Sequence, residues 1–60
     1  MNKKTKRAIN KYGIQTCIDA YEMHKAGNGA NTIAWSFQIL NGNTNAGDAA
    51  INAGREIKTI

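Results

Sequence analysis

A single cysteine in a chain of 60 residues is the feature that most constrains how this protein folds. A domain this small buries only roughly 60% of the surface that its unfolded chain exposes, so its hydrophobic core is marginal. Small domains usually compensate with disulfides or a structural zinc ion, but Cys17 has no second cysteine to pair with and no Cys/His cluster around it. The sequence therefore favours compact helix packing or oligomerisation. It also favours a reducing compartment, with Cys17 as a buried structural thiol.

Helices separated by glycine and asparagine are the natural interpretation, because the chain has no proline and little strand-like alternation. Apolar residues at helical spacing predict helical structure from about residue 4 to residue 25. Gly13 leaves open whether this is two helices or one bent helix. Ala26 and Gly27 provide a glycine-type stop at the end of this region. We expect an all-α fold, a small bundle of three or four short helices in a single domain of residues 1–60.

Two further helices are expected in the second half of the chain. The first covers residues 32–40 with Asn31 as its N-cap, and the second covers about residues 45–57 with Thr44 or Asn45 as its cap. Because the segment 32–40 is apolar almost all round, it is expected to be the central core helix. Trp35 and Phe37 should then lie in the core. An exposed Trp35 would instead serve as an anchor in a protein interface.

Positive charge is concentrated at the N-terminus. Eight basic residues against four acidic ones give a net charge of +4. Such a cluster favours a polyanionic partner, with nucleic acid the first candidate, although a solvated and partly disordered tail is the alternative. We expect residues 1–6 to form a flexible basic arm. The predicted phosphate-binding residues are Lys3, Lys4, Lys6, Arg7 and Lys11.

The last third of the chain carries the predicted base-reading residues. Asn45, Asp48, Asn52 and Arg55 recur at spacings of three and four, so on a helix they share one stripe. Asn and Arg pair bidentately with adenine and guanine edges in the major groove. Asp48 is either an acceptor for a cytosine amino group or a charge that favours the start of the helix. The opposite side carries small apolar residues and two glycines, which indicates either a close approach to a partner or a short helix.

A central helix, a short turn and an amphipathic last helix form the layout of a helix-turn-helix module. The stretch 49–57 resembles the recognition helix of the small phage Cro repressors, and 32–37 is similar to their bracing helix, with Ala34 as its small inward residue. The resemblance covers about residues 21–57. It implies a DNA-binding regulator that acts as a homodimer on a two-fold site. One departure is Gln38, which stands where the family has the glycine of its tight turn; here a glycine comes only at Gly42.

Other chemistry has little support in the sequence. His24 has no second ligand at metal-binding spacing, and the carboxylates show no pairing typical of an acid and a base. We therefore expect no enzyme activity, no cofactor and no metal. The chain has no apolar run that would span a bilayer, so we expect no membrane partner and a cytoplasmic location.

The sequence thus leaves two functional hypotheses. The first is a small sequence-specific DNA-binding transcription regulator, a phage-type repressor that reads double-stranded DNA with its C-terminal helix. The second is a phage-encoded small basic protein that binds and inhibits a host protein complex. The position of the basic segment separates them. If the basic N-terminal residues and the stripe of predicted base-reading residues lie on one side, DNA reading is favoured. If they lie on opposite sides, a protein partner is favoured.

Overall fold

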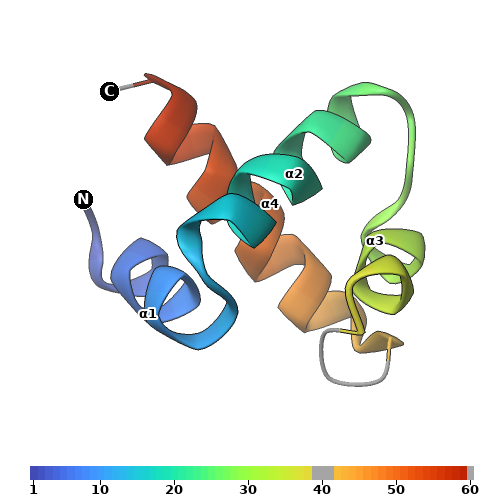
Figure 1. Cartoon of the computed structure of the whole chain (residues 1–60), viewed down its shortest axis with the longest axis horizontal. Helices are drawn as coiled ribbons and strands as arrows, with labels where there is room; N and C mark the ends of the chain where they lie inside the picture. The colour runs from blue at the N-terminus through green and yellow to red at the C-terminus, as the bar shows by residue number, and fades with distance from the viewer. Residues whose placement is uncertain (39–41, 60) are drawn as a thin grey trace.

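The computed structural model describes residues 1–38 and 42–59, which form four α-helices and no strand. This confirms the predicted all-α fold. Figure 1 shows α4 crossing the molecule diagonally, with the three other helices arranged around it. The helices in chain order are α1 (Lys3–Tyr12), α2 (Ile14–Lys25), α3 (Ala30–Ser36) and α4 (Thr44–Thr59).

Gly13 divides the first half of the chain into two helices. Its φ of 92° lies in the left-handed region, which a residue with a side chain rarely adopts. The Gly13 amide still donates to the Ile9 carbonyl at 2.9 Å, and its carbonyl accepts from the Cys17 amide at 3.2 Å. The backbone hydrogen bonding therefore passes through Gly13 while the chain changes direction. This settles the choice between one bent helix and two helices in favour of two.

The C-terminus of α2 has the glycine-type stop that the sequence predicts. The Asn28 amide donates to the Met23 carbonyl at 3.1 Å, and the Gly27 amide donates to the His24 carbonyl at 3.0 Å. These two bonds, with Gly27 at a φ of 104°, form a Schellman motif. The Asn28 side chain adds a hydrogen bond to the same Met23 carbonyl at 3.0 Å. The carbonyls of Met23 and His24 are thus satisfied without a basic side chain.

The start of α3 differs from the prediction. The N-cap is Gly29, which has no side chain to cap the helix, and Asn31 lies inside the first turn. The prediction of Asn31 as the N-cap is therefore wrong. Packing against α4 explains the position of this start. The Ala30 backbone lies so close to Gly47 of α4 that a Cβ atom at position 47 would be 2.2 Å from the Ala30 carbonyl oxygen. The backbone of α3 begins where it rests on α4.

The helix α3 is also shorter than the predicted segment 32–40. It ends at Ser36, and Phe37 is its C-cap residue. Ile39 and Leu40, which the prediction included in this helix, lie outside the described residues. Trp35 is 61% exposed, so the prediction that it belongs to the core is wrong. The helix instead buries Ile33 and Ala34, and Phe37 packs against the edge of the core.

Asn43 caps α4. Its side-chain Oδ1 accepts hydrogen bonds from the amides of Asn45 at 2.8 Å and Ala46 at 3.3 Å. The predicted caps, Thr44 and Asn45, are therefore wrong, because both already lie in the first turn of the helix. Asp48 lies beyond this turn, which contains no acidic residue. The expected role of Asp48 as a charge at the helix start is not supported.

The central helix is α4, not the predicted segment 32–40. It packs against α1, α2 and α3, whereas the seven-residue α3 is too short to contact all the others extensively. The physical reason is the small inner face of α4, which lets three neighbours come close at once. Gly47 and Gly54 of α4 allow α3 and α2 of the same chain to come this close, and α4 remains a regular helix of 16 residues. The buried residues of this face are Ala46, Gly47, Ala50, Ile51, Ala53 and Gly54.

Candidate nucleic-acid interface

The predicted base-reading residues lie on one exposed stripe of α4. Asn45, Asp48, Asn52 and Arg55 are all exposed, and their spacing places them on the side of the helix opposite its small buried face. We call these four residues the polar stripe. The sequence predicted both the helix and the exposed side correctly. Their role in reading bases stays a prediction.

Two members of the polar stripe are bonded to each other. The Arg55 guanidinium donates from Nη1 to the Asn52 Oδ1 at 3.1 Å. The same guanidinium lies 5.8 Å from the centre of the Tyr21 ring of α2, within the range of a cation–π contact. Arg55 is therefore held from two sides although it is exposed. This bond uses the amide oxygen of Asn52, and the amide nitrogen of the same side chain is a hydrogen-bond donor.

The basic segment forms α1, and its first turn packs against α4. Lys3, Lys4, Lys6, Arg7 and Lys11 are all exposed on this helix. Residues 3–6, expected to form part of a flexible arm, make up the first turn of α1, and Thr5 among them is only 3% exposed. The positive charges are thus carried by a helix. By their spacing Lys3, Arg7 and Lys11 follow one another at four-residue intervals along one side of it, with Lys4 beside Lys11 and Lys6 beside Lys3.

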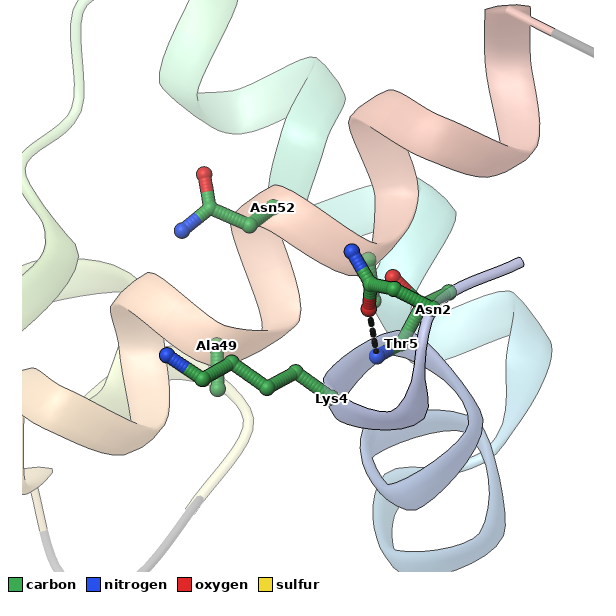
Figure 2. A pocket seen from close by; sticks show the side chains of 6 residues that line it. Asn2, Lys4, Thr5, Ala49 and Asn52 are labelled. Carbon is green, nitrogen blue, oxygen red and sulfur yellow. Dashed lines mark hydrogen bonds between the residues drawn. The ribbon is translucent and has the colours of Figure 1, made fainter.

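Lys4 lies beside the polar stripe. Together with Asn2, Thr5, Ala49, Asn52 and Ala53 it lines a surface pocket of about 280 Å³. Figure 2 shows the Lys4 side chain extending from α1 past Ala49, with Asn52 one turn further along α4. The volume falls just below the roughly 300–1,000 Å³ of typical small-molecule sites. We interpret the pocket as the junction of two surface elements. Lys4 of α1 and Asn52 of the polar stripe therefore lie on the same side of the molecule.

Glu56 fixes the start of α1 in this position. Its carboxylate accepts from the Thr5 hydroxyl at 2.5 Å and from the Asn2 amide at 3.0 Å, and it lies 3.6 Å from the N-terminal amine of Met1. The hydrogen bond from Thr5 is the main cause that lowers the pKa of Glu56, with the Asn2 amide and the terminal charge acting in the same direction. Asn2 also caps α1, because its Oδ1 accepts from the Thr5 amide at 2.8 Å. This network aligns Lys4 with α4.

Residues of α2 also contribute to this surface, which was not predicted from the sequence. Tyr21 lies beside Arg55, and the Lys25 ammonium lies 5.4 Å from the centre of the same ring. Next to them, Lys58 of α4 pairs with Glu22 of α2 at 3.4 Å. The spacing of Tyr21 and Lys25 places them on one side of α2, which is a usable signal. That this side faces Arg55 depends on tertiary packing, which spacing does not reveal.

Three further side chains with reactive groups, Cys17, His24 and Asp19, lie on α2. Cys17 is fully buried, and burial raises the pKa of its thiol, which disfavours the reactive thiolate. His24 is exposed, and its Nδ1 lies 3.4 Å from the Asn28 carbonyl oxygen. Asp19 accepts a hydrogen bond from Gln15 at 2.9 Å. Residues 1–38 and 42–59 hold no group of three or more His, Cys, Asp or Glu side chains arranged to bind a metal ion.

Comparisons with family models, with curated proteins and with solved structures give no match for this chain. The resemblance to the Cro repressors therefore rests on the quoted residues alone. Among the helices described above, none is both long enough and apolar enough to span a membrane.

Proposed function

We propose that this protein binds double-stranded DNA and acts as a small transcription regulator, a phage-type repressor that reads the major groove with α4. One observation carries the proposal: Lys4 of the basic helix and Asn52 of the polar stripe line the same pocket. A phosphate-binding group and base-reading groups on one side of a molecule can reach one duplex together. The net charge of +4 favours the approach of this side to a polyanion.

Each part of the surface has a distinct role in this proposal. The lysines and arginine of α1 bind phosphates, which gives sequence-independent affinity that falls with salt. Asn45, Asn52 and Arg55 pair with purine edges in the groove, and Asp48 accepts from a cytosine amino group. Asp48 also repels phosphate, so it favours a pose in which the stripe faces bases. A homodimer on a two-fold site, in the cytoplasm, fits the small size of the reading surface.

Selection of bound duplexes from a random pool tests the proposal. We expect enrichment of a palindromic sequence and binding that weakens steeply with salt. Arg55→Ala should cost about tenfold or more in preference for the selected site, while weak binding to unrelated duplexes changes little. Lys4→Gln should lower affinity for all sequences and reduce the salt slope by about 1. Failure to retain any duplex at low salt would refute the proposal.

A second candidate function is supported by the exposure of Trp35. A tryptophan that is 61% exposed is a typical anchor for a protein interface, and its indole packs over the backbone of Gly42. This supports the alternative in which the protein binds and inhibits a host protein complex. The two functions differ in a simple measurement. Under the alternative, Trp35→Ala abolishes partner binding, and the wild-type protein does not retain duplex DNA at low salt.

A further inference from the structure

The polar stripe is flanked by two helices, and the sequence assigned a role to only one of them. Lys4 of α1 approaches α4 at Ala49 and Ala53. Tyr21 of α2 approaches it at Gly54 and Arg55. Around the helix, Ala49 and Ala53 lie beyond one edge of the stripe, and Gly54 lies beyond the other edge, which is formed by Arg55. The helix α2 therefore also borders the proposed DNA surface.

The position of Tyr21 follows from the missing side chain of Gly54. A Cβ atom on Gly54 would lie 2.0 Å from the Cys17 carbonyl oxygen and 2.7 Å from the Tyr21 Cβ, so only glycine allows this approach. The Tyr21 ring is consequently brought next to Arg55, the residue that follows Gly54. Lys25, one turn further along α2, extends over the same ring. One aromatic side chain thus contacts two cations from two helices.

We infer that α2 forms the second flank of the DNA surface, with Tyr21 as a positioning residue for Arg55 and Lys25 as a phosphate contact opposite Lys4. The inference rests on the proposed function. Arg55 makes contacts with the Tyr21 ring and the Asn52 amide oxygen, which limit its rotation before DNA arrives. A guanidinium held in place loses less freedom when it pairs with guanine. Lys25 is exposed and its ammonium lies over the Tyr21 ring, whereas Lys58 is paired with Glu22.

Variants of Tyr21 test its positioning role. Tyr21→Leu removes the ring, and Tyr21→Phe is the matched control that keeps it. We expect Tyr21→Leu to reduce the preference for the selected site over a scrambled duplex by about tenfold, which is the size of one good bidentate contact. Tyr21→Phe should retain the preference. Equal preference in the two variants would overturn the role of Tyr21.

Variants of the lysines test the second flank. Lys25→Gln should lower the slope of log affinity against log salt by about 0.9 and leave site preference unchanged. Lys58→Gln removes the same charge from a lysine that is already paired, so its salt slope should match the wild type. An unchanged slope in Lys25→Gln would overturn the role of Lys25.

A measurement without DNA separates this inference from the proposed function. Ring currents of Tyr21 should shift the Arg55 side-chain protons upfield in the NMR spectrum of the wild-type protein. The shift should persist in Tyr21→Phe. Its absence in the wild type would overturn the positioning role even if Tyr21→Leu fails to fold. A wild-type protein that shows the shift but retains no duplex at low salt would instead refute the proposed function, and with it the phosphate contact of Lys25.

Discussion

Gly54 of α4 lies directly against the Cys17 carbonyl of α2, so close that a Cβ atom at position 54 would be 2.0 Å from that oxygen. Both residues are buried. Cys17 belongs to a small core cluster with Ala8 and Ala53, in which α1, α2 and α4 meet. The contact between these two residues therefore sets how closely α2 and α4 can pack.

We predict that Gly54→Ala destabilises the protein. Alanine favours a helix over glycine by up to about 1 kcal/mol, but the overpacked contact with the α2 backbone costs typically about 1–3 kcal/mol and here has no flexible neighbour to give way. Chemical denaturation measures the net change. Asp48→Ala, an exposed substitution in the same helix, should stay within about 0.5 kcal/mol of the wild type. A Gly54→Ala protein that is more stable than the wild type would contradict the close approach.

Asn43→Ala should cost about 1 kcal/mol of stability, within the range of about 0.5–2 kcal/mol for the loss of an N-cap. The reason is that the amides of Asn45 and Ala46 lose their side-chain acceptor. Asn43→Asp keeps an acceptor and should be nearly as stable as the wild type. Thr44→Ala provides the control, because Thr44 lies inside the helix. A larger loss in Thr44→Ala than in Asn43→Ala would show that the helix is capped one residue later.

The stability of the protein should fall in acid through Glu56. Its pKa is lowered in the folded protein, so its stabilising contribution is present above the ordinary value of 4.5 and is lost as the pH falls through the lower folded value. Thermal unfolding followed by circular dichroism at a series of pH values measures this loss. Glu56→Gln should be less stable than the wild type at pH 7 and should lose less stability between pH 5 and pH 3. Parallel pH profiles for the two proteins would contradict a role for this carboxylate.

The fluorescence of the protein should be that of an exposed tryptophan. Trp35 is the only tryptophan in the chain, and it is 61% exposed. We expect an emission maximum close to that of the unfolded protein and ready quenching by acrylamide in the native state. The urea-unfolded protein is the reference for both values. A blue-shifted emission that acrylamide barely quenches would show that Trp35 is covered, for example by a second copy of the chain.

The local pattern of the sequence was sufficient for much of the fold. The absence of proline and the helical spacing of apolar residues predicted an all-α chain, and Ala26 with Gly27 predicted the end of α2. The spacing of Asn45, Asp48, Asn52 and Arg55 placed them on one exposed stripe. These features depend on neighbours within about one helical turn, so they can be read from the order of residues.

Contacts between distant residues decided the rest. The helix α4 takes the central position because the side chains on its inner face are smaller than those of α3, and small side chains let several neighbours pack closely. Trp35 of α3 is exposed as a consequence. The bond between Thr5 and Glu56 and the contact between Tyr21 and Arg55 join segments far apart in the chain. Hydropathy and spacing describe each helix alone. They do not say which helices meet, and that choice depends on packing the whole chain at once.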